Sequence, residues 1–171
     1  YLVVQDNGNV VVQGKPNDSL WFTQSGSDYV GDLGIKHTLT LDSVAQVYRL
    51  TEVDGTYTEF DSVTGMFRRR ADLAGNKIEV KAILSNAYNF TEVERRYTAG
   101  STTTIEQFSY QYSEPTGDQL LDSVTLRRKV GSGAWQNVSR ARYAYYGLND
   151  TYGRESDLKT VKTDLWVDSA W

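Results

Sequence analysis

The sequence predicts an all-β fold: an antiparallel meander of about twelve short strands that forms a curled sheet, an open barrel or a sandwich. Three observations predict it. Hydrophobic and polar side chains alternate with a period of two along much of the chain. Turn signals that contain glycine recur at short intervals. The 12 tyrosines, together with many threonines, suit a pleated and half-buried surface.

Length and composition fit one folded domain over residues 1–171, of which 39% are hydrophobic. A net charge of -4 argues against a nucleic-acid partner. No apolar stretch reaches the roughly 18–20 residues of a membrane helix, so we expect no membrane insertion. The absence of cysteine excludes disulfides, thiolate metal ligands and a cysteine nucleophile. The chain begins at Tyr1 without a signal-like segment, so we expect a piece of a larger protein.

Turn signals divide the chain into hairpins. They are Asn7-Gly8, 14–18, 31–34, Asp54-Gly55, Thr64-Gly65, Gly75-Asn76, Ala99-Gly100, 115–118, 131–133 and 147–150. Asn-Gly and Asp-Gly supply the positive φ angles that tight hairpin turns need. We therefore expect N-terminal hairpins over residues 1–45 and a second series of hairpins over residues 46–165.

Between the turns, apolar or aromatic side chains recur at every second position, as on strands with one buried face. The runs are Ile78, Val80, Ala82 and Leu84; Phe108, Tyr110 and Tyr112; and Trp135, Tyr143 and Tyr145. Residues 92–97 fit either a turn of helix or a strand with Tyr88 and Phe90. The polar stretch 148–157 is expected to be a loop.

One hairpin pattern recurs three times, over residues 57–71, 108–124 and 142–161. Each copy has an aromatic strand, a glycine turn and a returning strand that carries Leu, Val or Thr. Because a single hairpin cannot bury its own face, the copies should stack or curl side by side.

These copies resemble the repeats of the RHS, or YD-repeat, family. Residues 50–56, followed by Phe60-Asp61 and Gly65, look like the start of an RHS array. The stretch 72–78, Asp-Leu-Ala-Gly-Asn-Lys-Ile, is similar to the family's Asp-x-x-Gly-Asn connection. Residues 143–146, with Gly153 and 158–161, resemble its Tyr-x-Tyr-Asp…Gly-x-Leu unit, although Tyr146 or Gly147 replaces the Asp.

The resemblance implies a β-strip that is wound, in larger relatives, into a shell around a C-terminal toxin. The family's self-cleaving core carries Asp-Pro dipeptides, but Pro16 follows Lys15 and Pro115 follows Glu114 here. The resemblance therefore implies a non-catalytic structural or binding segment of a large, secreted or surface-located bacterial protein. Its partners would be the rest of the parent polypeptide or neighbouring repeats, and it would need no cofactor.

A second resemblance lies at the N-terminus, where Gln5, Asn9 and Val11 match the Gln-x-Asp-x-Asn-x-Val-x-Tyr repeat of bulb-type lectins. Asn7 replaces the Asp of that repeat and Gln13 replaces the Tyr, so a charged acceptor and an aromatic hydroxyl are missing. The alternative is an ordinary hairpin with an Asn-Gly turn, which turn chemistry favours.

The alternative function is therefore a carbohydrate-binding module with a glycan partner. Sugars stack on flat aromatic faces, and amide side chains bind their hydroxyl groups. The candidate side chains are Gln5, Asn7, Asn9, Gln13, Trp21, Trp135 and Trp166, with Trp171 a further tryptophan. Most large aromatic side chains of a β domain of this size are nevertheless expected in its core.

Few features of the sequence support a catalytic or metal-binding function. His37, the one histidine, precedes Thr38-Leu39-Thr40-Leu41 and is expected to share a strand face with two leucines. Carboxylates such as Asp54, Glu59 and Asp61 have no spacing that sets an acid and a base at a fixed separation. Arginine runs such as 68–70 should alternate between faces, stack on aromatic rings and protect sheet edges. We expect no catalytic, cofactor-binding or metal-binding residues.

Overall fold

A computed structural model describes residues 1–15, 18–84, 89–113 and 119–167, and this part of the chain is all β. The strands are β1 (Leu2–Val4), β2 (Val10–Lys15), β3 (Asp18–Ser25), β4 (Asp28–Gly31), β5 (Thr38–Asp42), β6 (Val47–Thr51), β7 (Tyr57–Asp61), β8 (Phe67–Ala71), β9 (Lys77–Ile83), β10 (Phe90–Ala99), β11 (Thr102–Tyr112), β12 (Leu121–Val130), β13 (Gln136–Tyr145) and β14 (Leu158–Leu165). Within the described ranges there is no helix of the length and apolarity that crossing a membrane requires.

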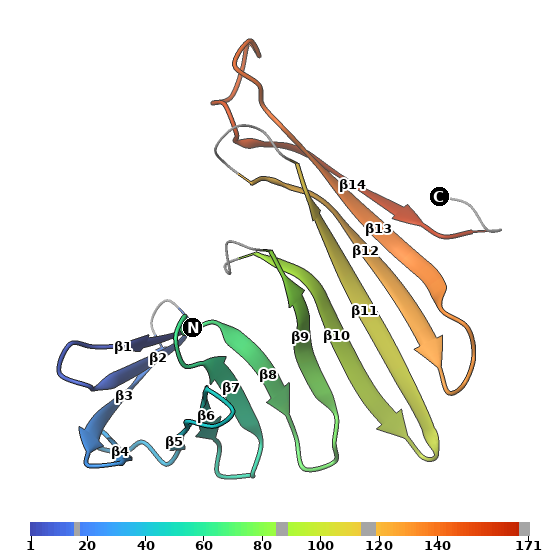
Figure 1. Cartoon of the computed structure of the whole chain (residues 1–171). Coiled ribbons are helices and arrows are strands. Elements are labelled where there is room, and N and C mark those ends of the chain that lie inside the picture. Colours follow the sequence, from blue (N-terminus) through green and yellow to red (C-terminus); the bar gives the residue numbers. More distant parts are fainter. Residues whose placement is uncertain (16–17, 85–88, 114–118, 168–171) are drawn as a thin grey trace. The chain divides into compact units, whose positions relative to one another are not determined.

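The strands form a single meander sheet in sequence order from β1 to β14, and the sheet is not closed (Figure 1). The predicted fold class is confirmed, and of the three predicted arrangements the open, curled sheet is the one observed. Residues 92–97 belong to β10 and not to a helix, whereas 148–157 form the expected loop. The turn residues Pro16 and 115–118, the strand residue Tyr88, and Trp171 lie outside the described residues.

The described residues form fourteen strands instead of about twelve, and two of the turns described between them were not predicted from the sequence. One separates β3 from β4 at Gly26, which has a φ of 64°. The other joins β5 to β6 without any glycine. There the Asp42 side chain accepts hydrogen bonds from the backbone N–H groups of Val44 and Ala45, and Gln46 takes a φ of 54°.

The chain splits into two compact units, residues 1–80 (unit 1) and residues 81–171 (unit 2). Unit 1 contains a hydrophobic core to which alternate residues of neighbouring strands contribute. Its buried members are Leu2, Val10, Val12, Phe22, Leu39, Tyr48, Leu50 and Phe60, with Leu20, Tyr29 and Ile35 packed against them. Val10 and Val12 of β2 and Leu20 and Phe22 of β3 show the period of two that places alternate side chains on the buried face.

The sheet of unit 1 curls until its first strand meets the turn between β7 and β8 (Figure 1). The Leu2 backbone N–H donates to the Gly65 carbonyl over 2.9 Å. A Cβ atom at Gly65 would lie 1.9 Å from the Leu2 carbonyl oxygen, so only glycine permits this approach. The contact brings Leu2 into the same core cluster as Phe60 of β7.

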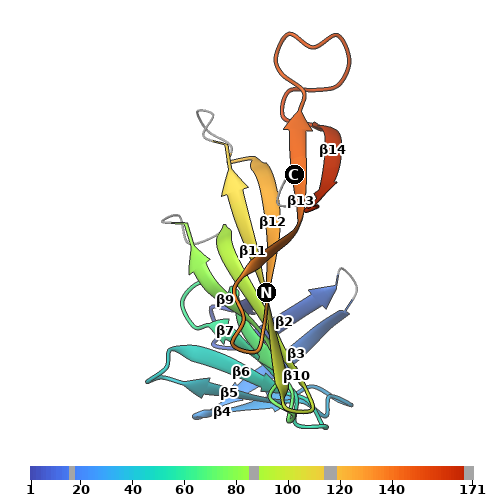
Figure 2. The ribbon, with the colours of Figure 1, turned by 90° about the vertical axis from the view of Figure 1, so that its right-hand side faces the viewer.

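Unit 2 consists of long strands in one twisted layer, as β10 to β14 show in Figures 1 and 2. One face carries apolar cross-strand pairs, because Val93 pairs with Phe108, Phe108 with Leu126, and Tyr110 with Val124. Of these side chains only Val93 is buried, and the rest are half-buried. Ladder hydrogen bonds and side-chain contacts within one layer therefore hold most of unit 2 together.

The three predicted hairpin copies are antiparallel strand pairs. They correspond to β7 with β8, β11 with β12, and β13 with β14. Each pair contains a bulge, between Glu59 and Phe60, Gln111 and Tyr112, and Ala144 and Tyr145 respectively. A bulge increases local twist, which suits a sheet that curls.

Candidate functional site

The lectin-like motif forms a hairpin turn and not a continuous strand. Gln5, Asn7 and Asn9 belong to the turn between β1 and β2, whereas Gln13 lies farther along β2 beside Tyr1. The Asn7 Oδ1 accepts the Asn9 backbone N–H over 3.0 Å, and the Asn9 Oδ1 accepts the Gln24 backbone N–H over 3.1 Å. Both side-chain oxygens therefore stabilise the turn.

The same turn occurs three times in unit 1, at residues 5–9, 52–56 and 72–76. In each, the first backbone N–H donates to the fifth carbonyl over 2.8–3.0 Å. The N–H of the glycine donates back to the first carbonyl over 2.9–3.1 Å. Gly8, Gly55 and Gly75 have φ angles of 84°, 83° and 81°. The predicted hairpin with an Asn-Gly turn is confirmed, and its geometry matches that of the turns at residues 52–56 and 72–76.

The candidate tryptophans belong to different units and have different surroundings. Trp21 of β3 is 47% exposed. Trp135, in the turn between β12 and β13, is 37% exposed, and the Arg127 guanidinium lies 5.2 Å from its ring centre. Trp166 follows β14, is half-buried, and donates its backbone N–H to Val138 over 3.0 Å. Trp21 therefore has the most accessible ring of these candidates.

Trp21 lies on the face of β1 to β3 that points away from the core. Cross-strand pairing places Val11 opposite Trp21, and Val3 opposite Val11. One pair farther along the same face, the Tyr1 hydroxyl donates to the Gln13 side-chain oxygen. This outer face therefore combines an exposed indole ring with an amide and a phenol.

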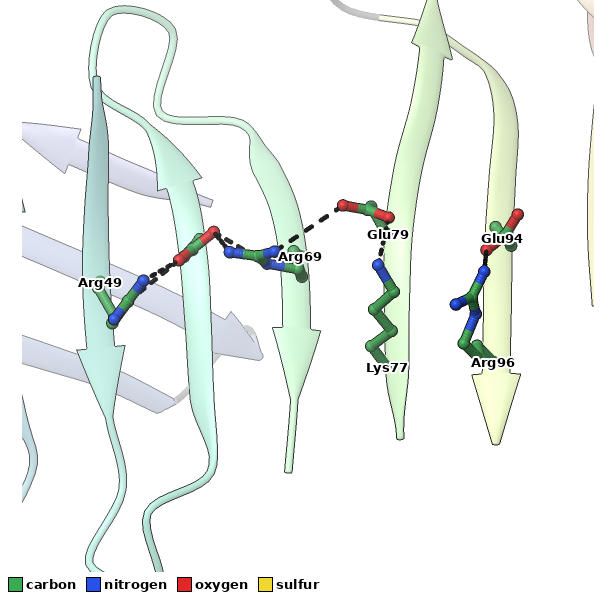
Figure 3. A network of polar contacts seen from close by, with 7 residues as sticks. Arg49, Arg69, Lys77, Glu79, Glu94 and Arg96 are labelled. Atoms are coloured by element: carbon green, nitrogen blue, oxygen red, sulfur yellow. Dashed lines mark hydrogen bonds and ion pairs between the residues drawn. The ribbon is translucent and has the colours of Figure 1, made fainter. Parts of the chain in front are cut away.

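In unit 1, a set of charged side chains surrounds the buried Glu59 of β7. Its neighbours directly across both strand pairs are Arg49 of β6 and Arg69 of β8. Arg49 donates to Oε1 at 2.7 and 3.0 Å, and Arg69 donates to Oε2 at 2.8 and 3.1 Å. Figure 3 shows both guanidinium groups reaching in from their strands. We call this arrangement of a carboxylate between two arginines a clamp.

The clamp of Glu59 continues into β9. Glu79 lies opposite Arg69, with 4.0 Å between the carboxylate and the guanidinium, and Lys77 donates to Glu79 over 2.8 Å (Figure 3). The charges therefore alternate in sign across neighbouring strands from β6 to β9. The Tyr57 ring adds cation–π contacts, because its centre lies 4.7 Å from the Arg49 guanidinium and 5.5 Å from that of Arg69.

A second clamp is centred on Glu106 of β11 in unit 2. Arg95 of β10 and Arg128 of β12 are its directly opposite neighbours. Arg95 binds Oε2, with its Nε at 2.8 Å, and Arg128 binds Oε1 at 2.7 and 3.0 Å. The Glu106 side chain is 2% exposed, whereas the arginines are about half exposed. The carboxylate is thus covered by its two cations.

Both clamp carboxylates are held in the ionised form. Burial alone would raise the pKa of Glu59, but the hydrogen bonds and charges of Arg69 and Arg49 outweigh it and lower that pKa. The same balance lowers the pKa of Glu106, where burial is opposed by Arg128 and Arg95. A carboxylate with a lowered pKa and both oxygens occupied is poorly suited to act as a general acid or base.

Asp164 of the last strand has only part of this environment. Arg140 lies directly opposite it on β13 at 3.4 Å, and Arg142 donates to it at 2.9 and 3.1 Å. Its side chain keeps 23% exposure, compared with 6% for Glu59 and 2% for Glu106. The strand order ends at β14, so cations reach Asp164 from one side only.

The other predicted chemical groups have structural surroundings. His37 is half-buried and lies one residue before β5, and of the two leucines of that strand Leu39 is buried but Leu41 is 41% exposed. The Asp54 side chain accepts the Thr56 N–H, and the Asp61 side chain accepts those of Val63 and Thr64. No group of three or more potential metal ligands occurs among the described residues.

The arginine runs are only partly as predicted. Arg69 joins the clamp whereas Arg70 pairs with Glu52, so these two neighbours do point to opposite faces. Arg68 lies at the bulge between Phe67 and Arg69 and pairs with Asp61, two residues after Glu59 on β7, so the alternation does not hold there. Cation–π contacts are present at Arg69, Arg95 and Arg127. Edge protection is wrong for these runs, because β8, β10, β12 and β13 are all interior strands. Each such arginine has a strand on both sides, which is what lets it reach a carboxylate.

Sequence reasoning missed the clamps. A signal was present, since Glu59 lies inside an aromatic strand of the repeat and Glu106 stands two residues before another, each followed by an arginine-containing strand. Pairing an arginine with one of these carboxylates, however, requires the strand register.

Comparisons with protein-family models, with curated proteins and with solved structures found no match to this chain.

Proposed function

We propose that this chain is a non-catalytic structural segment of a larger, secreted or surface-located, RHS-like protein. Its role would be to provide a rigid β-sheet on which the rest of the parent polypeptide or neighbouring repeats pack. The hairpin copies β11–β12 and β13–β14 are adjacent in the sheet, as expected of repeats that stack edge to edge.

The clamps are the observation on which the proposal depends. Each joins three neighbouring strands through a carboxylate that is almost fully buried. Removing the charge of such a carboxylate leaves two arginines without their shared partner, which is strongly destabilising. The most buried carboxylates of both units thus hold strands in register, which suits a scaffold better than a catalyst.

Limited proteolysis tests this proposal. The double variant Glu59→Gln/Glu106→Gln should be digested about tenfold faster or more than the wild type under native conditions, because strand opening becomes easier. Glu155→Gln, a substitution of the same kind at an exposed loop residue, is the control and should leave the rate unchanged. Equal digestion of the double variant and the wild type would remove the support for a rigid scaffold.

We also propose, as a second candidate, that the outer face of β1 to β3 binds carbohydrate. The exposed Trp21 ring, with Gln13 and the Tyr1 hydroxyl on the same face, supports it. Aromatic stacking combined with amide and hydroxyl hydrogen bonds is the usual chemistry of sugar recognition.

A glycan array separates the two candidates. Carbohydrate binding should give saturable hits that Trp21→Ala abolishes, while Trp135→Ala leaves them unchanged because one side of that ring faces Arg127. Signals at background level for the wild type would eliminate the second candidate. Hits that survive Trp21→Ala would place any binding elsewhere.

A further inference from the structure

Strand β14 is the last strand of the sheet order, and its outer edge has no partner strand in the part of the chain that the structure describes. Its residues are mostly exposed, including Val161 at 51% and Leu165 at 66%. An open edge of this kind is a template for another strand. In unit 1 the opposite end of the order differs, because Leu2 of β1 already donates its N–H to Gly65.

Asp164 indicates which side chain a strand paired with this edge would carry. Glu59 and Glu106 each have a cation directly opposite on both neighbouring strands. Asp164 has Arg140 opposite on β13 and Arg142 two residues farther along the same strand, so both of its cations come from β13 and its second side is open. We call this one-sided arrangement a half-clamp. A strand that completed it would place a cation directly opposite Asp164.

We propose that a second copy of this chain supplies that strand, through antiparallel pairing of β14 with β14 and with Thr163 on the two-fold axis. In this register Lys162 of each copy lies opposite Asp164 of the other, so each Asp164 gains a cation on its second side. Lys162 makes no ion pair with any residue that the structure describes, and its opposite neighbour on β13 is Arg142. It therefore gains a carboxylate where it now faces another cation.

The other face of the strand also matches in this register. Val161 of one copy lies opposite Leu165 of the other, so four exposed apolar side chains form two cross-strand pairs. The symmetry is of the self-complementary two-fold type that dimers most often use.

The backbone has the orientation that the pairing needs. Trp166 donates its N–H to Val138 of β13, so residues at even positions of β14 direct their backbone groups toward β13. Residues at odd positions, Val161, Thr163 and Leu165, then direct theirs to the open side. Two copies of Thr163 can therefore exchange N–H to C=O hydrogen bonds at the axis.

Neighbouring registers are less favourable. An axis at Lys162 sets the two lysines directly opposite each other, and an axis at Asp164 does the same with two carboxylates. An axis at Val161 pairs Asp164 with Leu158, so the clamp stays incomplete. With the axis at Thr163, one face gains the Lys162–Asp164 pairs and the other gains the Val161–Leu165 pairs.

Sedimentation equilibrium of the whole chain tests the proposal. The wild type should form a reversible dimer with a dissociation constant below about 100 µM. Lys162→Glu should raise this constant by about tenfold or more, because the new carboxylate would lie opposite Asp164. Thr163→Pro should do the same by removing an outward N–H without loss of a β13 hydrogen bond. Lys36→Glu, an identical charge change in an exposed loop of unit 1, should dimerise like the wild type.

Cysteine cross-linking tests the register, and the chain has no cysteine of its own. Across an antiparallel hydrogen-bonded pair the Cα atoms are about 5.5 Å apart, so Thr163→Cys should oxidise to a covalent dimer. Val161→Cys should not form a disulfide, because in the proposed register the two copies of residue 161 are roughly 13 Å apart along the strands. A wild type that stays monomeric, a Lys162→Glu variant that dimerises normally, or cross-linking at position 161 instead of 163 would overturn the proposal.

Discussion

Gly65 is the residue at which the first strand meets the turn between β7 and β8. Its φ of 69° is one that L side chains rarely adopt, and the Leu2 carbonyl occupies the space where a Cβ atom would be. Gly75 occupies a comparable turn with a φ of 81°, but nothing lies within 4 Å of its Cβ position. The two glycines therefore share a positive φ angle, and only Gly65 of the two contacts β1.

Substituting each glycine separates backbone strain from this contact. Gly75→Ala should lower the free energy of unfolding by about 1–2 kcal/mol, the cost of the left-handed conformation. Gly65→Ala should cost about 3 kcal/mol or more, because Leu2 must also move away. Urea unfolding midpoints measure both. Equal losses would mean that the contact between Leu2 and Gly65 adds nothing to stability.

The buried phenol of Tyr48 makes stability depend on alkaline pH. Burial, with a hydrogen bond to the Tyr29 hydroxyl at 3.3 Å, raises the pKa of Tyr48 from 10.0 to about 12. The folded state therefore holds this proton more tightly than the unfolded state. Its contribution to stability is complete below pH 10.0 and is lost as the pH rises toward about 12.

Tyr48→Phe should remove this dependence, so that its stability falls less steeply above pH 10.0 than that of the wild type. Denaturant titrations at a series of alkaline pH values provide the measurement. Tyr152→Phe, at a side chain that is 80% exposed, is the control and should follow the wild type. Parallel curves for Tyr48→Phe and the wild type would contradict the expected effect.

At the scale of strands, the clamps make neighbouring elements depend on one another. Each links three consecutive strands, and Glu79 extends the first one to β9. The lowered pKa values of Glu59 and Glu106 mean that the unfolded state binds more protons than the folded state. The clamp contribution is therefore present above the ordinary carboxyl pKa of 4.5 and is lost as the pH falls through the lowered values.

Acid titration of stability should show this loss directly. The wild type should lose free energy of unfolding below about pH 4.5, and Glu59→Gln/Glu106→Gln should lose less over the same range. The comparison matters because Asp54, Asp61 and Asp72 also have lowered pKa values and contribute acid sensitivity in both proteins. If the difference in free energy of unfolding between wild type and variant stayed constant with pH, the clamps would not be the source of the acid sensitivity.

At the scale of the molecule, the buried core is unevenly distributed. Among the described residues, every buried hydrophobic side chain except Val93 belongs to unit 1. Phe60 is 5% exposed in that core, whereas Phe108 of unit 2 is half-buried on a single layer. Unit 2 therefore depends more on strand pairing and on charged contacts.

This difference should appear in stability and in amide exchange. Phe60→Ala should cost about 3–5 kcal/mol and Phe108→Ala about 1–2 kcal/mol, because less apolar area is lost from a half-buried site. Hydrogen exchange should be slower for β2, β3, β6 and β7 than for β12 to β14. Faster exchange in unit 1 than in unit 2 would show that the core does not dominate local stability.

The sequence by itself determined the strands, most turns and the hairpin copies, because alternation and glycine chemistry act over a few neighbouring residues. It also indicated correctly that Asn7 and Gly8 form a turn. It did not reveal the glycine-free turn at Asp42–Gln46, since a side-chain carboxylate and a non-glycine residue at positive φ make that turn.

Only the tertiary structure decided which charges meet and which rings stay exposed. Glu106 binds Arg95, which is 11 residues before it in the sequence, and Arg128, which is 22 residues after it. The backbone contact between Leu2 and Gly65 joins residues that are separated by most of the sequence of unit 1. Such contacts depend on the register and curl of the sheet. A shift of one residue would turn Glu59, Glu106 and Asp164 to the opposite face, so local pattern alone could not place them.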